Sequence, residues 1–184
     1  DEGAVVGAAH ELHAFGGGGA GGAGVDPGVR LHVNGAASGD NGLDLAGLAA
    51  REGVADLVTF SGPVPAPALA AQFRAADVVA MPSASETYGL VALEAQACGT
   101  PVLAHRVGGL VYAVLDGVSG RHVTAGTPEA WADALAEILA DRDAWAALGT
   151  GAVRHAAGHS WEAYADGLLE AVAAVPRRSP GLDA

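Results

Sequence analysis

The sequence predicts an α/β fold, a doubly wound parallel sheet of the Rossmann type followed by a C-terminal helical segment. Three observations lead to this prediction. Short apolar runs typical of buried strands alternate with stretches of helical periodicity about five times along the chain. Glycine or proline stands at most of the boundaries between them, where a strand or a helix has to end. With 184 residues, of which 51% are apolar, the chain is long enough for one domain with its own core, which we expect over residues 1–175.

The start of the chain combines a predicted helix with a glycine-rich tract. Apolar residues recur at helical spacing from Glu2 to Phe15, so we predict an amphipathic helix there. Residues 16–28 follow with few side chains to pack. They have neither the strand before nor the helix after them that a phosphate-binding loop needs, so we interpret them as a flexible loop. At the other end of the chain, we expect residues 176–184 to be a disordered tail.

The elements between these ends follow from their periodicity. Strands are predicted over residues 30–34, 57–60, 78–81, 102–104 and 121–123. Helices are predicted over residues 43–52, 66–75 and 88–98, shortly after residue 109, and through most of 127–175. In the last segment the apolar residues form a stripe, and we interpret its tryptophans as core residues: Trp131, Trp145 and Trp161.

Residues 77–105 carry most of the functional information. The predicted strand Val78–Met81 is followed by a polar loop that contains Glu86. The helix predicted after this loop contains a second acid, Glu94, and a Gly-Thr-Pro sequence ends that helix before the next strand. At a rise of about 1.5 Å per residue, the two carboxylates are separated by on the order of 10 Å along the helix axis.

The start of this helix is a predicted anion site. Free backbone amides of Tyr88, Gly89 and Leu90 would point out of the helix N-terminus, where the helix dipole favours negative charge. With an acid on each side of these amides, the arrangement suits a ligand that has hydroxyl groups at both ends and a diphosphate in the middle.

The surrounding residues resemble a known family. The spacing Glu86-x7-Glu94 lies within Pro-Ser-x-Ser-Glu-x-Tyr-Gly-Leu-Val-x-Leu-Glu-Ala-x-Ala-x-Gly-x-Pro-Val, which closely resembles the nucleotide-sugar signature of the retaining GT-B glycosyltransferases of family 4. Within that family, the run from Val91 to Val102 looks most like the members that glycosylate an inositol phosphate. The chain would then be the C-terminal, donor-binding half of such an enzyme.

The resemblance implies an activity and its partners. The expected donor is a nucleotide diphosphate sugar, UDP-glucose or UDP-N-acetylglucosamine. The sugar would pass, with retention of configuration, to a polyol or sugar acceptor. Neither a metal ion nor a cofactor is implied. A truncated module that only binds nucleotide sugars, and a sugar epimerase of the same architecture, remain as alternatives.

The resemblance also implies residue roles. Glu86 would contact donor-sugar hydroxyls near the reacting carbon, Glu94 would bind the ribose, and the amides around Gly89 would hold the diphosphate. The turn formed by Ser61, Gly62 and Val64 would lie beside the base, although a plain tight turn explains these residues equally well. The glycine pair Gly108 and Gly109, placed before a short helix, is a possible further contact to phosphate or sugar.

Two parts of the family pattern are absent from this sequence. Family members have a second doubly wound domain that binds the acceptor, and an Arg and a Lys before the first helix of the donor domain that neutralise the departing diphosphate. This chain begins at Asp1 and contains no Lys. We therefore expect the first strand and the acceptor domain to be missing, and the fragment alone to be inactive.

Composition excludes several other classes of function. A net charge of −12 without a basic stripe argues against nucleic acid or anionic lipid as a partner. No apolar run approaches the about eighteen residues of a membrane span, and we expect a cytoplasmic protein. The single cysteine, Cys98, is interpreted as a small core residue.

Metal and hydrolase sites are also not predicted. His10 and His13 lie three apart without a third ligand, and His155 and His159 lack the Glu of a metalloprotease motif. No Gly-x-Ser-x-Gly elbow surrounds a serine, which argues against a hydrolase.

Overall fold

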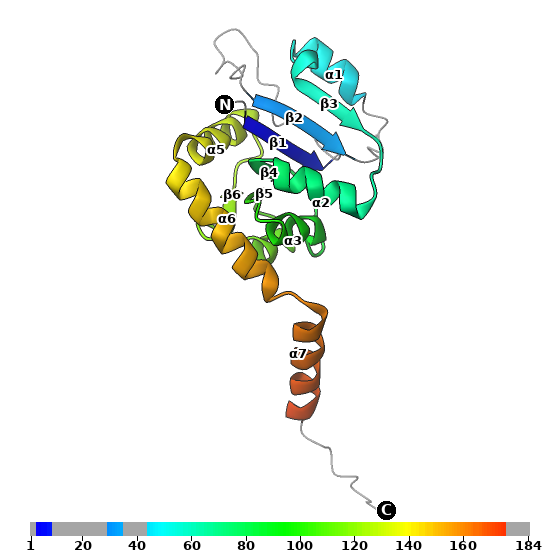
Figure 1. Cartoon of the computed structure of the whole chain (residues 1–184), viewed down its shortest axis with the longest axis vertical. Coiled ribbons are helices and arrows are strands. Elements are labelled where there is room, and N and C mark those ends of the chain that lie inside the picture. Colours follow the sequence, from blue (N-terminus) through cyan, green and yellow to red (C-terminus); the bar gives the residue numbers. More distant parts are fainter. Residues whose placement is uncertain (1–2, 9–28, 35–43, 176–184) are drawn as a thin grey trace, which may run out of the picture.

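The computed structural model describes residues 3–8, 29–34 and 44–175, and its centre is a six-stranded parallel sheet in the order β3-β2-β1-β4-β5-β6 (Figure 1). The strands are β1 Gly3–Ala8, β2 Val29–Asn34, β3 Val58–Ser61, β4 Val78–Met81, β5 Val102–His105 and β6 Gly120–Val123. The helices are α1 Leu45–Arg51, α2 Ala66–Ala75, α3 Leu90–Ala97, α4 Leu110–Ala113, α5 Pro128–Ala140, α6 Arg142–Ala157 and α7 Trp161–Ala174, with a short 3-10 turn at Ala55–Leu57. The predicted Rossmann-like sheet and C-terminal helices are confirmed.

The strand order places a topological switch point at the middle of the sheet. The chain moves outward from β1 through β2 to β3, and then returns to the other side of β1 with β4, β5 and β6. In open parallel sheets, ligands bind at the carboxyl ends of the strands where the order reverses. The loop after β4, which contains Glu86, leaves the sheet at that point.

The helix predicted from Glu2 to Phe15 is wrong for residues 3–8, which form strand β1. This strand pairs in parallel with β2 on one side and with β4 on the other. Strand pairing on both sides outweighs the local helical spacing of a few apolar residues. The expectation of a missing first strand depended on that helix and loses its basis. Residues 9–15, the predicted loop 16–28 and the predicted tail 176–184 lie outside the described residues.

Two apolar layers cover the faces of the sheet. Alternate residues of β4 and β5 enter opposite layers, and all four residues of β4 are buried, as expected for an interior parallel strand. One layer joins the sheet to α1, α5 and the start of α6, and contains Trp131 at its centre. The other joins it to α2, α3 and α4, and Cys98 packs against this second layer as a partly buried residue.

The C-terminal tryptophans divide into core and surface. Trp131 is buried, and Trp145 is half-buried with its indole Nε1 donating to the Asp77 carbonyl at 2.6 Å. Trp161 is 87% exposed, so its predicted core position is wrong. It begins α7, which projects from the rest of the fold and has no buried residue (Figure 1). A helical apolar stripe is buried only where the fold supplies a partner surface.

Candidate functional site

The loop between β4 and α3 forms the centre of the candidate site. Glu86 is half-buried in this loop, and its Oε1 accepts hydrogen bonds from the backbone amides of Tyr88 and Gly89, each at 3.2 Å. The prediction that these amides are free is therefore wrong for two of the three, because the nearest carboxylate already uses them. The observation still agrees with the expected chemistry, since the group that these amides hold is an anion.

Gly89 is required at the start of α3 for two reasons. Its φ of +93° lies in the left-handed region that side chains disfavour. A Cβ at this position would also lie 2.8 Å from the Ala113 Cβ, so α4 packs directly against it. The residue therefore sets how the loop enters α3.

The predicted glycine pair contacts this loop rather than open solvent. The Gly109 amide donates to the Glu86 carbonyl at 2.8 Å. A Cβ on Gly109 would lie 2.5 Å from the Tyr88 Cα, and a Cβ on Gly108 would overlap the Glu86 carbonyl oxygen. The pair thus lets the loop after β5 dock on the loop after β4, and it positions the backbone around Glu86.

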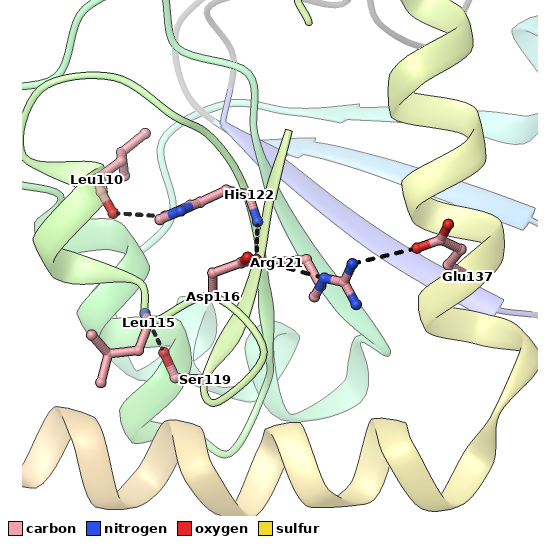
Figure 2. A network of polar contacts seen from close by, with 7 residues as sticks. All are labelled: Leu110, Leu115, Asp116, Ser119, Arg121, His122 and Glu137. Carbon is pink, nitrogen blue, oxygen red and sulfur yellow. Dashed lines mark hydrogen bonds and ion pairs between the residues drawn. The ribbon is translucent and has the colours of Figure 1, made fainter. Parts of the chain in front are cut away.

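A polar network holds the short helix α4 that follows this pair (Figure 2). The His122 Nε2 lies 3.3 Å from the Leu110 carbonyl, to which it donates, and the His122 amide donates to Asp116 at 2.9 Å. Arg121 bridges Asp116 and Glu137 at 3.5 Å each, which ties β6 to α5. Figure 2 also shows the Leu115 amide donating to the Ser119 hydroxyl, at 2.9 Å.

A buried amide holds α4 from the other side. Gln96 on α3 is fully buried, and its Nε2 donates to the Ala92 carbonyl at 3.0 Å and to the Ala113 carbonyl at 2.7 Å. Sequence reasoning missed Gln96 and His122 as supports of the site. A polar residue among the alanines of an apolar helix was the available signal for Gln96, and none of comparable strength marked His122.

Glu94 faces solvent on α3, five residues, or about 1.4 turns, after Gly89. Its neighbours Ala92, Leu93 and Ala95 are buried, so the helix presents Glu94 on its open side while the opposite side packs on the sheet. The structure brings Glu86, Tyr88 and Gly89 into direct contact in the loop, and Glu94 lies apart from them on α3.

The predicted base contacts lie further along the carboxyl edge of the sheet. Ser61 ends β3 and is half-buried, Gly62 is exposed, and Val64 is half-buried. Two strands, β2 and β1, separate β3 from β4, so Ser61 lies three strand spacings, or roughly 14 Å, from the end of β4. A ligand that contacts both must be extended along this edge.

Comparison with known proteins decides the family. The family described as "Glycosyl transferases group 1" matches residues 23–155. The chain belongs to this family. A group 1 relative, the D-inositol 3-phosphate glycosyltransferase of Segniliparus rotundus, is 53% identical over 154 residues, which are 82% of this chain and 34% of that protein. The chain thus spans about a third of the length of that relative.

Solved structures of two further proteins are similar to this chain in fold. Sucrose-phosphate synthase from Thermosynechococcus elongatus matches with a TM-score of 0.72 and 34% identity, over 80% of this chain and 39% of that one. Anabaena Alr3699/HepE in complex with UDP-glucose matches with a TM-score of 0.73 and 26% identity, over 93% of this chain and 49% of that one.

The described residues also bear on metal sites and membrane spans. Among them, no three His, Cys, Asp or Glu side chains gather to hold a metal ion. His155 and His159 instead contact each other ring to ring at 4.5 Å, while His10 and His13 lie outside the described part of the chain. None of the helices described here is long and apolar enough to cross a membrane.

Proposed function

We propose that this chain binds the donor of a glycosyl transfer, a nucleotide diphosphate sugar, along the carboxyl edge of its sheet. The observation that carries the proposal is the loop beside the switch point, where backbone amides already hold the carboxylate of Glu86. Glu94 stands exposed on α3, about one turn after that helix begins at Leu90. Family membership and the UDP-glucose named for the HepE neighbour support a UDP-linked donor.

The amide contacts suggest how the donor enters. Glu86 and a diphosphate compete for the amides of Tyr88 and Gly89, because both are anions. When the diphosphate takes these amides together with that of Leu90, the Glu86 carboxylate is released. It can then accept hydrogen bonds from donor-sugar hydroxyls near the reacting carbon, while Glu94 accepts those of the ribose.

The chemical step follows from this placement. The bond between the anomeric carbon and the diphosphate oxygen breaks, and the amides stabilise the negative charge that develops on the leaving diphosphate. A hydroxyl of a polyol or sugar acceptor attacks the anomeric carbon from the face that the diphosphate leaves and passes its proton to an oxygen of that diphosphate, so the configuration is retained. We propose that no metal ion is needed, because backbone amides take its place together with the cations of the family pattern, an Arg and a Lys that are absent from this sequence.

Calorimetric titration of UDP-glucose and UDP-N-acetylglucosamine tests the donor site. We expect Glu94→Ala to weaken binding about tenfold to a hundredfold, because it removes charged acceptors of the ribose hydroxyls. Asp133→Ala is the matched control, since it removes the same charge from an exposed position on α5. Equal affinities of the wild type and Glu94→Ala would remove the ribose role.

The chain by itself is expected to bind donors weakly and to transfer sugar negligibly. It spans about a third of the length of its relatives, and transfer needs an acceptor site and cations that the predicted site does not include. Turnover of UDP-glucose by the purified 184-residue chain at rates of ordinary enzymes would contradict this expectation.

A further inference from the structure

An aromatic cluster connects the last helix to the donor loop. The cluster consists of Tyr88 in the loop, His155 at the end of α6, His159 in the turn after it, and Tyr164 on α7. The Tyr88 and Tyr164 ring centroids are 5.9 Å apart with planes at 55°, and those of His159 and Tyr164 are 6.4 Å apart. Such tilted geometries are attractive contacts between rings.

The cluster is anchored at its far end. The His155 Nε2 donates to the Tyr112 carbonyl on α4 at 3.2 Å, and His159 Nδ1 lies 3.0 Å from the His155 carbonyl. The two imidazoles meet edge to face at 4.5 Å. The turn that leads into α7 is therefore fixed to α4, and Tyr164 is presented to the loop from a defined position.

Tyr164 marks the place where α7 approaches the body of the fold. None of the α7 residues is buried. Tyr164 is 46% exposed, whereas Trp161 is 87% and Leu168 66% exposed. Tyr164, which contacts Tyr88, is thus the least exposed of the large α7 side chains.

Tyr88, the partner of Tyr164, belongs to the loop that holds Glu86. The Tyr88 amide donates to the Glu86 carboxylate, and Gly109 packs against the Tyr88 backbone. The Tyr88 ring and this amide belong to the same residue, so a contact that holds the ring acts on the segment that holds Glu86.

We propose that Tyr164 is a positioning residue for the donor loop. Its ring holds the Tyr88 ring in place, and through it the amides that receive the diphosphate. This inference rests on the proposed function, because it assigns those amides to the donor. It extends that function to a helix that carries none of the predicted donor contacts.

Titration of UDP against the 184-residue chain, followed by NMR, tests the inference. We expect Tyr164→Ala to weaken UDP binding about threefold to tenfold, the range of one aromatic pair. Tyr164→Phe should bind like the wild type, because the contact uses the ring and not the hydroxyl. Leu168→Ala, which truncates an exposed side chain on the same helix, is the matched control and should also bind like the wild type.

A double-mutant cycle separates positioning from general stability. In the Tyr88→Ala background, Tyr164→Ala should have no further effect on UDP affinity, since its partner is gone. Three results would each overturn the inference. They are the same loss from Tyr164→Ala in the Tyr88→Ala background as in the wild type, an equal loss in Leu168→Ala, and a loss in Tyr164→Phe.

Hydrogen exchange in the protein without nucleotide gives a readout that does not depend on the proposed function. Tyr164→Ala should speed exchange at the Tyr88 and Gly89 amides, and Leu168→Ala should not. If the wild type fails to bind UDP, the proposed function fails, and the exchange result alone decides the inference. Unchanged exchange at both amides in Tyr164→Ala would overturn it.

Discussion

The unit formed by β4, α3 and β5 and the helix α7 stand at opposite extremes of packing in this molecule. In the first, every residue of β4 is buried and the connecting loops approach so closely that glycine is needed where they meet. In the second, no residue is buried, although the helix carries as apolar a stripe as α5. Both α3 and α7 are regular helices with a defined N-cap residue, Gly89 for α3 and Ser160 for α7.

The difference shows what determines burial in this fold. The sheet gives α3 a surface to cover, so its small apolar residues are enclosed and its acidic residue is turned outward. Helix α7 lies beyond the sheet and contacts the body through the aromatic cluster. Changes in the first region should therefore be expressed in global stability, and changes in α7 in local order or in the donor loop.

The largest contrast is expected between two tryptophans. Trp131→Ala should lower the free energy of unfolding by about 3–5 kcal/mol, because it removes a buried ring from the core and leaves a cavity. Trp161→Ala should change it by less than about 0.5 kcal/mol, since the ring is exposed. Urea denaturation followed by circular dichroism measures both. Similar costs at the two positions would refute the contrast between the regions.

A smaller contrast is expected between two glycines. Gly109→Ala should destabilise the protein by about 2–4 kcal/mol, because its methyl group would overlap the Tyr88 backbone and separate the two loops. Gly167→Ala on α7 meets no neighbouring atom and should stabilise that helix by up to about 1 kcal/mol. The midpoint of urea unfolding checks the first value, and amide exchange in α7 checks the second. A neutral Gly109→Ala would show that the loops can separate without cost.

The sequence predicted the elements of both regions better than their packing. Runs such as Val78–Met81 indicate a buried strand because an interior parallel strand is apolar on both faces. The strand at residues 3–8 was missed because pairing with β2 and β4 is a long-range property that a short apolar run does not reveal. For the same reason, no local pattern shows that Trp161 lacks a partner.

The sequence placed the candidate residues on a loop and a helix that the structure contains, but it did not show their contacts. The spacing of Glu86 and Glu94 gave the correct loop and helix. It could not show that Glu86 turns back onto the amides of Tyr88 and Gly89, since that depends on side-chain torsions. Nor could it show that Gly109 supports this loop, because the two segments meet only when β4 and β5 pair.

Two helix N-caps give a further test of the difference between the two regions, because loss of an N-cap costs about 1 kcal/mol of stability. Thr127 caps α5 by accepting from the Ala130 amide at 3.4 Å, and Ser160 caps α7 by accepting from the Ala163 amide at 3.2 Å. Thr127→Ala should lower global stability, because α5 is part of the core. Ser160→Ala should reduce helical signal and speed amide exchange in α7 while global stability stays unchanged. Equal shifts of the unfolding midpoint would show that α7 unfolds together with the sheet.

The smallest effect concerns the histidine that links the two regions. Burial, and next the charge of the neighbouring His159, lower the pKa of His155 below its ordinary value. The unfolded chain then binds this proton at a higher pH than the folded one. His155 should therefore reduce stability as the pH falls through about 6.5, and the loss should level off below the folded pKa. The group is only half-buried, so the change is small.

The variant His155→Gln tests this directly, because its side-chain amide can still donate to the Tyr112 carbonyl but does not titrate. Urea midpoints of the wild type and the variant are compared at pH 7.5 and pH 5.5. The difference between the two proteins isolates His155 from the carboxylates, which titrate in both. We expect the wild type to lose slightly more stability on acidification than the variant, and a larger loss in the variant would reverse the sign of the linkage.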